Sequence, residues 1–465
     1  MKHISMRRTL VPLALGLALT ASSGCDILRS EYQRTDAVNT AGAWNDESGY
    51  ESVMRSPEGS WWLDFEDPVL TGLIEQGLEA GTDLKSAAKT LQIAAYRADI
   101  EDLSLLPTPN ARLSSSKTWD HDGRKSPSSS ASLGISYEID LFGRLKAQRD
   151  AARFAYEAGY EDYQAVRLAL TSQIASAYWK TAYLNDAMAS EMENVREYEV
   201  LIRLAKLKYD EGAISLYDYN RTRSQQLNAQ SNVETYRRQL EESTDALLLL
   251  LGADSAGELK TDPSAFTLKG RKVPRIRPGI PADILENRPD LRSAENSLKS
   301  KLAEFDASAL SFFPTLTLTG TLGAGSPALL KFFDDPYLSV AGTLAAPFLN
   351  YKNLTLNRNV SKATYEKAVL DFEKTLRGAL FEVKEYLVQL ETGRARLENT
   401  AKALELAEEN DRYYKLWYES GKMSYGDFLD NRRTLRATAV EYLNELRGEL
   451  ESSAMLYKAL GGAMR

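Results

Sequence analysis

The chain has 465 residues, 26% of them charged, and a net charge of −8 at neutral pH. With two histidines and one cysteine in the sequence, residue supply argues against histidine catalysis, zinc sites, cysteine nucleophiles and internal disulfides. The acidic balance argues against a nucleic-acid partner. We therefore expect a protein that is not an enzyme, binds no metal and needs no cofactor.

The amino terminus carries a secretory signal. Three basic residues precede an apolar run over residues 10–21 that is too short to span a bilayer. Small residues then lead directly to Cys25, and this pattern resembles the lipobox of bacterial lipoproteins. The resemblance implies cleavage before Cys25 and attachment of a lipid such as palmitate to it, whereas the alternative is an ordinary signal with an incidental cysteine. Residues 1–24 are thus predicted as a lipoprotein signal peptide and 25–60 as an acylated tether.

Two helices and a β-hairpin are predicted next. Asp67 and Pro68 are typical of the N-cap and first position of a short helix. A second helix is predicted over 83–106, where prolines end it. Two extended segments then form a hairpin at about 109–142 around a polar loop, Asp120 to Ser129.

The second strand of this hairpin has the clearest alternation in the chain. Its apolar positions are Leu133, Ile135, Tyr137, Ile139 and Leu141, with polar or small residues between them. This length and period are typical of a strand that spans a membrane with lipid on one side and water on the other. Half of a soluble sheet fits the alternation equally well. We favour the membrane because no other element predicted in this part of the chain can cover the apolar face.

A very long helix is predicted over 144–211. The segment contains no proline and one glycine, and a single helix of this length would extend about 100 Å. From Ile174 onward its apolar positions recur at an average spacing of about 3.5 residues, the period of a left-handed supercoil. The helix is therefore predicted to lie along other helices. A turn at 212–215 and a returning helix over 216–251 follow.

The same unit then occurs a second time. A shift of 209 residues superimposes the two long helices and turns, and a shift of 207 superimposes the segments before them. The aligned turn residues are Tyr209 and Tyr418, Gly212 and Gly421, Ser215 and Ser424, and Asp218 and Asp427. We predict one repeat over 61–252, a connector over 253–289 and a second repeat over 290–465.

The second repeat is predicted to contain the same elements as the first. After an initial helix, a hairpin is placed at about 315–348 around the loop Gly323 to Pro336, followed by a long helix over 352–420 and a returning helix over 425–460. Its strands alternate too, with apolar positions Leu316, Leu318 and Leu322 on one and Leu338, Val340, Gly342 and Leu344 on the other.

Four strands in one chain cannot close a barrel. About eight strands make the smallest known outer-membrane barrel, and an open sheet edge in lipid leaves backbone groups without partners. Two copies would give eight strands and three would give twelve; we favour three because the attached helices need a wide barrel. The predicted fold is mainly α with a membrane β-barrel, in which three chains build a 12-stranded barrel continuous with a cylinder of long coiled-coil helices.

Several features together resemble the TolC family of outer-membrane channels. They are the lipobox-like start, Trp61-Trp62, Arg288-Pro289-Asp290-Leu291, Phe313-Pro314 before a Thr/Leu strand, and Gly-x-x-Ser-x-x-Asp at both turns. Within the family, the chain resembles the lipoprotein branch that serves resistance–nodulation–division (RND) efflux pumps. The resemblance covers Trp61 to Gly462 and implies a homotrimer in the outer membrane of a Gram-negative bacterium. It also implies docking through a periplasmic adaptor protein onto an inner-membrane RND transporter.

The resemblance also implies which residues form the pore constriction. Acidic residues just after the second turn of such channels face the axis, and the matching positions here are Asp427 and Asp430, with Tyr418 shortly before them. Asp427 has an alternative role, because Ser424-x-x-Asp427 is also a capping-box pattern, as is Ser215-x-x-Asp218. The alternative for Asp430 is a solvated helix surface.

The turns themselves are the predicted contact with the adaptor. This rim contains Gly212, Ser215, Asp218, Gly421, Lys422 and Ser424. The two glycines are expected to supply positive φ angles. Exposed side chains at the rim could equally be plain surface.

A passive efflux conduit for small molecules, drugs or metal ions is the first functional hypothesis. An outer-membrane channel for protein or peptide secretion is the alternative in the same class. A lipid-anchored periplasmic coiled-coil scaffold without a pore is the alternative from another class, and it leaves the four alternating strands unexplained.

Overall fold

The structure is a computed structural model that describes Ser30, Tyr32 and residues 60–119, 121, 123, 125–276, 287–326 and 336–462. The chain forms two compact units. The first takes Met1–Ala37, Lys89–Glu161 and Arg292–Thr375, and the second takes Val38–Ala88, Asp162–Leu291 and Leu376–Arg465. The predicted signal peptide, Cys25 and nearly all of the predicted tether lie outside the described residues.

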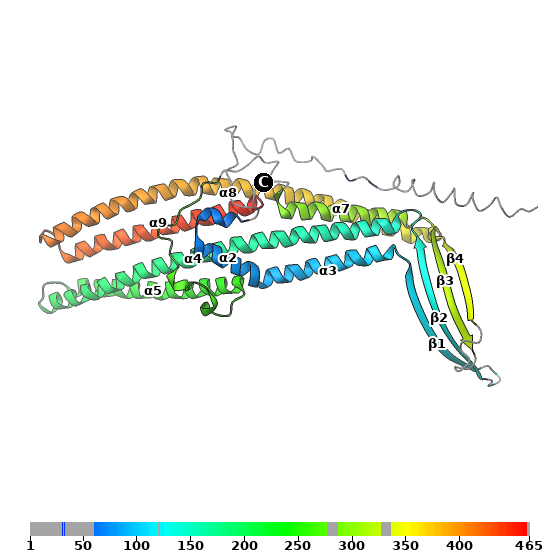
Figure 1. Ribbon diagram of the computed structural model, residues 1–465. Helices are drawn as coiled ribbons and strands as arrows, with labels where there is room; N and C mark the ends of the chain where they lie inside the picture. Colours follow the sequence, from blue (N-terminus) through cyan, green and yellow to red (C-terminus); the bar gives the residue numbers. More distant parts are fainter. Residues whose placement is uncertain are drawn as a thin grey trace, which may run out of the picture. The chain divides into compact units, whose positions relative to one another are not determined.

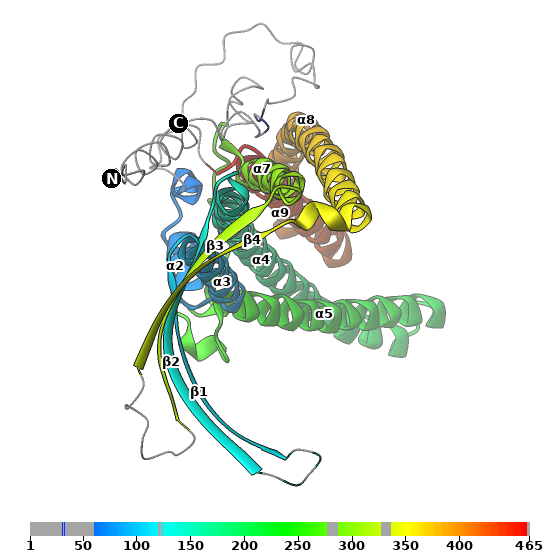
Figure 2. The same cartoon turned by 90° about the vertical axis from the view of Figure 1, so that its right-hand side faces the viewer.

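The first unit contains one antiparallel sheet. Its strands are β1 (Thr108–Trp119), β2 (Lys125–Ile139), β3 (Thr315–Ser326) and β4 (Pro336–Ala345), and they lie side by side in chain order (Figure 1). The sheet curves strongly along its strands (Figure 2). Each repeat thus contributes one hairpin, and β2 of the first repeat pairs with β3 of the second.

The register places the apolar residues of all four strands on one face. Residues directly opposite each other in an antiparallel pair share a face. The aligned pairs include Ala111↔Leu133, Leu133↔Leu322, Leu316↔Leu344 and Leu322↔Leu338. The predicted alternation is therefore confirmed, and the apolar stripes of separate strands merge into one continuous surface.

The strands of both hairpins extend into segments that are predicted to be loops. Lys125–Ser129, expected in the polar loop, belong to β2. Of the second predicted loop, residues 323–326 belong to β3 and Pro336 belongs to β4. The interpretation failed because ladder hydrogen bonds form between backbones whatever the side chains are. Ser128–Ser130 face Ser114–Ser116 across the ladder, so polar residues extend the hairpin as well as apolar ones do.

Each strand of the first unit is joined to a helix. α3 (Thr82–Ser104) and α7 (Pro289–Leu310) end shortly before β1 and β3, and α4 (Arg144–Asp210) and α8 (Tyr351–Glu419) begin shortly after β2 and β4. Phe142 follows β2 and Phe313 precedes β3, and their rings stack with centroids 4.6 Å apart. They cover a small core of Ala147, Ala307 and Leu310, so α4 and α7 approach closely where they meet the sheet.

The second unit contains the main hydrophobic core. It joins η3 (Trp61–Phe65), α2 (Pro68–Ala80), the middle of α4, the end of α5 (Leu216–Leu251) and the end of α9 (Tyr425–Ala459). Its largest fully buried side chains include Trp61, Tyr178, Trp179, Leu247 and Leu251. Trp61 stacks on Tyr457 with centroids 5.6 Å apart. The core therefore ties the first residues of repeat one to the last helix of repeat two.

Asp67 does more in this core than cap α2. Its Oδ1 accepts hydrogen bonds from the amides of Val69 and Leu70 at 3.0 and 3.3 Å, which confirms the predicted N-cap. Its Oδ2 accepts a bond from the Tyr178 hydroxyl at 2.9 Å and lies 2.9 Å from Arg271. Because Asp67 is 3% exposed, these partners are what make its burial tolerable.

The connector between the repeats packs onto α4. It contains the short helices η4 (Ala256–Glu258) and η5 (Pro263–Ala265). Asp186 of α4 accepts a hydrogen bond from the amide of Leu268 at 2.9 Å, and Asn185 donates to two connector carbonyls.

The long helices are confirmed as single elements. Helix α4 has 67 residues and α8 has 69. None of the described helices contains a stretch long and apolar enough to cross a lipid bilayer.

A glycine marks the point where two short helices meet end to end in each repeat. Gly252, just after α5, has φ +64°, and a Cβ there would lie 2.6 Å from the carbonyl oxygen of Ala80 at the end of α2. Gly461, just after α9, has φ +87°, and its Cβ would lie 2.5 Å from the carbonyl oxygen of Asn287. The two pairs are related by the same shifts as the repeats. The duplicated glycines therefore let the returning helix of each repeat abut the start of the helix that leads to the sheet.

We expect Gly252→Ala and Gly461→Ala each to destabilise the protein by roughly 1–3 kcal/mol, because the new methyl group meets backbone and the positive φ is strained. Thermal unfolding followed by circular dichroism would measure the loss. Gly72→Ala in α2 is the matched control, since no atom lies within 4 Å of the added methyl. Equal melting temperatures for all three variants would contradict the prediction.

A carboxyl group is buried between α8 and α9 in the second unit. Glu449 is 2% exposed, and neither of its carboxylate oxygens has a hydrogen-bond partner among the described residues. It fits because Gly393 stands opposite, where a Cβ would come within 2.3 Å of Glu449 Oε2. Burial raises the pKa of Glu449 to about 7, with Glu445 adding to the shift and Arg394 and Arg396 opposing it.

This pKa makes stability depend on pH. The folded protein retains the Glu449 proton up to about pH 7, whereas the unfolded chain releases it near pH 4.5. The stabilisation is therefore complete below the unfolded value and is lost as pH rises through the folded value. From about pH 5 to about pH 8 we expect wild type to lose roughly 1–3 kcal/mol more stability than Glu449→Gln does. Melting temperatures across this range test it, with the exposed Glu441→Gln as control; parallel curves for wild type and Glu449→Gln would refute it.

Candidate functional site at the two helical turns

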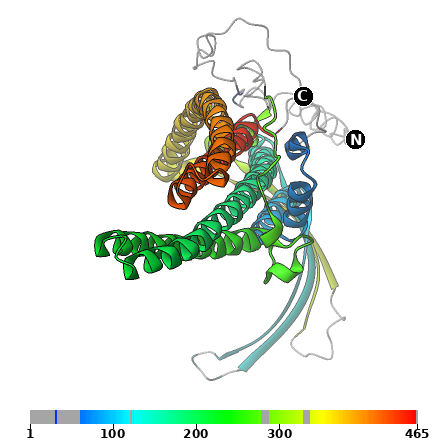
Figure 3. The same cartoon turned by 90° about the vertical axis from the view of Figure 1, so that its left-hand side faces the viewer.

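The two turns of the second unit are built the same way. At the first, the amides of Gly212 and Ala213 donate to the carbonyls of Tyr209 and Lys208 at 2.9 and 2.8 Å, and Gly212 has φ +72°. This pair of bonds is a Schellman motif, which satisfies the last carbonyls of α4. The predicted positive φ of the turn glycine is present. Figure 3 looks onto this turn, in green, and onto the second, in orange.

The second turn repeats this geometry at the end of α8. The amides of Gly421 and Lys422 donate to the carbonyls of Tyr418 and Trp417 at 3.0 and 2.9 Å, and Gly421 also has φ +72°. No atom lies within 4 Å of a Cβ added at either glycine. The glycines are therefore required by backbone conformation and not by crowding.

Both serines cap the helix that follows. Ser215 Oγ accepts a hydrogen bond from the amide of Asp218 at 3.1 Å, and the Asp218 carboxylate accepts from the amide of Ser215 at 3.4 Å. Ser424 Oγ accepts from the amide of Asp427 at 3.1 Å and donates to its carboxylate at 2.6 Å. The capping role of both serines is thus present, and Asp427 is exposed with one carboxylate oxygen engaged by Ser424.

An aromatic pair stacks across each turn. Tyr209 stacks on Tyr219 with centroids 5.7 Å apart, and Tyr418 stacks on Phe428 with centroids 5.2 Å apart. Tyr219 and Phe428 are related by the shift of 209. Tyr418 thus packs across its own turn, and this pairing could have been found by aligning aromatic positions of the two repeats.

Asp430 is paired with a cation that sequence reasoning missed. Arg433, one turn further along α9, forms an ion pair with Asp430. The same guanidinium lies 4.7 Å from the ring centroid of Tyr198 on α4. The Asp430 side chain is 64% exposed, so the carboxylate faces solvent with part of its charge compensated.

Arg436 attaches α9 to α4 just beyond this pair. Its guanidinium donates to Asn194 Oδ1 at 2.7 Å and to Glu197 Oε1 at 3.0 Å, with a second contact to Glu197 Oε2. The Arg436 and Glu197 side chains are 14% and 19% exposed, so the bidentate pair is largely shielded and stronger than a surface pair. The returning helix of repeat two is therefore fixed to the long helix of repeat one.

The predicted residues fall into three groups. The turns and the caps of the helices that follow them are formed by Gly212, Gly421, Ser215, Ser424 and Asp218. Lys422 is exposed at the tip of the second turn. Tyr418 lies at the end of α8, and Asp427 and Asp430 lie near the start of α9. No group of three or more His, Cys, Asp or Glu side chains in metal-binding geometry occurs among the described residues.

Comparison with known proteins supplies the decisive observation. The family described as outer membrane efflux protein matches residues 73–253 and 280–462. The chain belongs to the outer membrane efflux protein family. The family matches twice, once over most of each repeat, and the second match begins at residue 280, inside the predicted connector.

Individual relatives agree over almost the full length. The toluene efflux pump outer membrane protein TtgF of Pseudomonas putida is 31% identical over 487 residues, covering 98% of this chain and 97% of the relative. The open-state MtrE outer membrane channel of Neisseria gonorrhoeae superimposes with a TM-score of 0.74 at 27% identity, covering 86% of this chain and 90% of MtrE. The CmeC outer membrane channel of Campylobacter jejuni has the same fold, with a TM-score of 0.81 at 24% identity and coverages of 94% and 95%.

This outer membrane efflux protein is a channel component of an efflux pump, and it is not an enzyme. The conduit hypothesis is thereby confirmed over the scaffold hypothesis. The location is the outer membrane of a Gram-negative bacterium.

Proposed function

We propose that this efflux protein is a lipid-anchored homotrimeric exit duct that passively conducts small toxic molecules from the periplasm to the exterior. Its partners would be a periplasmic adaptor and an inner-membrane RND transporter, as the resemblance to the lipoprotein branch implies. The related TtgF is named for toluene efflux, and by that likeness we infer that apolar organic compounds are among the cargo. The lipid would be attached at Cys25.

The observation that carries the trimer is the open sheet. Among the described strands, β1 and β4 each pair on one side only. The apolar face is bare, with Leu113, Leu338 and Val340 each between 76% and 80% exposed. Lipid suits that face, but the edge amides and carbonyls need backbone partners in lipid. Other copies of the same sheet supply them, and three copies give twelve strands.

The helices next to the two edges support the same arrangement. α3 leads directly into β1 and carries an exposed apolar stripe of Ile93, Tyr96, Ile100 and Leu103, each between 52% and 62% exposed. α8 follows β4 and exposes Leu356, Val360 and Leu370 at 58% to 65%. A seam that joins β4 and α8 of one copy to β1 and α3 of the next uses two different surfaces. Heterologous contacts of this kind form a ring when the rotation between neighbouring copies closes.

The acidic residues of the second turn would form the pore constriction. Three-fold repetition places three copies of Asp427 and of Asp430 around the axis, where rings of carboxylates favour cations. Because Arg433 compensates Asp430, we propose that Asp427 contributes more of the field than Asp430 does. Tyr418 supports the constriction by packing under it. The rim formed by Gly212, Ser215, Asp218, Gly421, Lys422 and Ser424 would face the adaptor.

The seam is tested by Ile100→Lys. A lysine in the middle of the α3 stripe buries an unpaired charge when copies associate, so we expect monomers where wild type gives trimers in detergent. Light scattering coupled to size-exclusion chromatography reports the mass. Asp99→Lys, one position off the stripe, should remain trimeric. A trimeric Ile100→Lys variant would exclude this stripe from the interface.

The constriction is tested by ion selectivity in planar bilayers. Asp427→Asn combined with Asp430→Asn should lower the preference for cations without dissociating the trimer, because carboxylate charge is removed from the narrowest point. Arg433→Gln should shift the reversal potential the opposite way, since it frees the Asp430 charge. Asp218→Asn in the first turn is the control and should leave selectivity unchanged. An unaltered reversal potential in the double variant would remove these residues from the constriction.

A further inference from the structure

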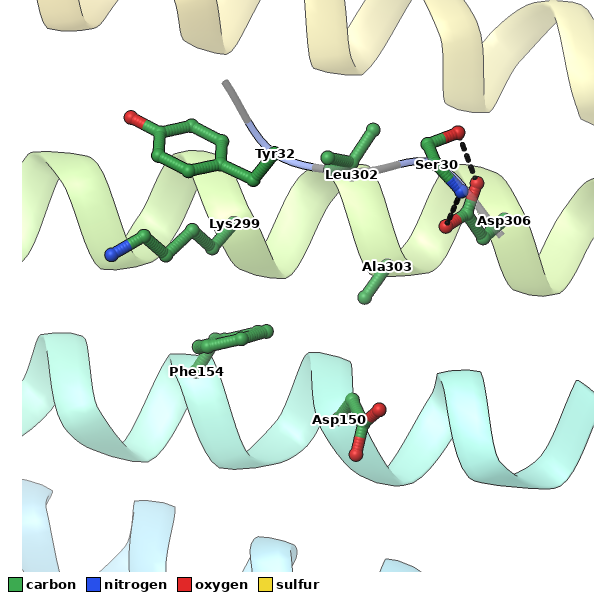
Figure 4. Close-up of a pocket in the computed structure, with 8 residues that line it drawn as sticks. All are labelled: Ser30, Tyr32, Asp150, Phe154, Lys299, Leu302, Ala303 and Asp306. Carbon is green, nitrogen blue, oxygen red and sulfur yellow. Dashed lines mark hydrogen bonds between the residues drawn. The ribbon is translucent and has the colours of Figure 1, made fainter. Parts of the chain in front are cut away.

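Two residues of the chain's own N-terminal segment form part of the wall of a cavity in the first unit. The cavity has a volume of about 430 Å³. Figure 4 shows Ser30 and Tyr32 lying along α7, with Phe154 and Asp150 of α4 on the opposite wall. The remaining lining comes from Lys299, Leu302, Ala303 and Asp306 of α7.

Asp306 binds Ser30 at two points. Its Oδ2 accepts a hydrogen bond from the Ser30 amide at 3.0 Å, and its Oδ1 accepts one from the Ser30 hydroxyl at 2.7 Å. Asp306 is 5% exposed, and a buried carboxylate is costly unless donors satisfy it. One donor is a backbone amide, so the contact fixes the path of the segment as well as one side chain.

Tyr32 makes a second, independent contact. The Lys299 ammonium lies 5.2 Å from the centroid of the Tyr32 ring, which is within the range of a cation–π contact. Lys299 is about two turns from Asp306 on the same helix. The segment is therefore held at two points along α7, Ser30 at Asp306 and Tyr32 at Lys299. These two contacts define the direction in which the segment runs along the helix.

We propose that the face of α7 that carries Lys299 and Asp306 is the docking site of the chain's own N-terminal segment, and that Asp306 thereby holds Cys25 beside the lipid-facing strands. The second part rests on the proposed lipidation of Cys25. The occupant is identified by Ser30 and Tyr32, which lie on this face of α7.

Chain geometry sets the reach of the anchor. Ser30 is five positions after Cys25 in the chain, a distance that spans at most about 18 Å when fully extended. Asp306 lies only about 6 Å along the axis from Leu310, the last residue of α7, and β3 begins shortly after it at Thr315. Without the docking site, the chain between Cys25 and Ser60 would let the lipid range over up to about 120 Å. Docking therefore confines an acyl chain on Cys25 to the base of the sheet, where it can enter the bilayer.

Limited trypsin digestion of the full-length protein in detergent tests the docking. Trypsin cleaves after Arg29, the residue directly before Ser30, and it needs that bond undocked. We expect Asp306→Ala to speed this cleavage at least about tenfold, because cleavage tracks the open population. Glu304→Ala, an exposed acid on the same helix, should cleave at the wild-type rate. Equal rates of cleavage after Arg29 in wild type and Asp306→Ala would overturn the proposal.

A second variant avoids any effect on the packing of α7. Ser30→Ala combined with Tyr32→Ala removes the hydroxyl and the ring from the segment and leaves both helices unchanged. This variant should also be cleaved faster than wild type, and it decides the matter if Asp306→Ala does not fold. An unchanged rate here would overturn the proposal independently.

The mass of the released Cys25–Arg29 peptide separates docking from lipidation. Faster cleavage of the variants together with an acylated peptide supports both parts of the proposal. Faster cleavage with an unmodified peptide retains the docking site and overturns the positioning of a lipid. An acylated peptide released at equal rates overturns the docking site and leaves the proposed lipidation standing.

Discussion

The constraint on which this structure depends is that backbone hydrogen bonds must be satisfied where no water can supply them. The four strands bring their apolar residues to one face, and this face suits lipid. The same sheet ends at β1 and β4, whose outer edges have unpaired amides and carbonyls within the described chain. A single copy is therefore incomplete by chemistry and not only by comparison with its relatives. The proposed trimer follows from that deficit, because copies of the same edges are the partners that fit it.

Duplication explains how the remaining elements satisfy their own ends. Each returning helix stops at a glycine with positive φ and meets the start of the helix that leads back to the sheet. Each long helix stops at a Schellman glycine, and a serine caps the helix that follows. The two repeats thus use the same local chemistry at corresponding points, although few of their other residues are identical.

The two repeats carry different charges just after their turns. Asp430 in the second repeat corresponds to Arg221 in the first, and Arg433 compensates Asp430 while it packs on Tyr198. Arg436 and Glu197 bind the returning helix of one repeat to the long helix of the other. Arg433 therefore contacts both Asp430 of the proposed constriction and the long helix of the first repeat.

The sequence by itself determined the order, type and approximate length of the elements. Helix period, the lack of proline over residues 144–211 and the alternation from Leu133 to Leu141 are local properties, and local properties suffice to specify helices and strands. The duplication located both turns and both turn glycines for the same reason. These parts were predictable because each depends on residues close together in the chain.

Tertiary structure alone decided what depends on residues far apart. Strand pairing extended β2 through the serines of a predicted loop, because the partner strand and not the local pattern sets where a ladder ends. Burial without a partner raised the pKa of Glu449, because Gly393 on another helix makes room for it. The contact of Arg433 with Tyr198 on α4 and the capture of Ser30 by Asp306, 276 residues away, likewise depend on side chains whose meeting no sequence spacing records.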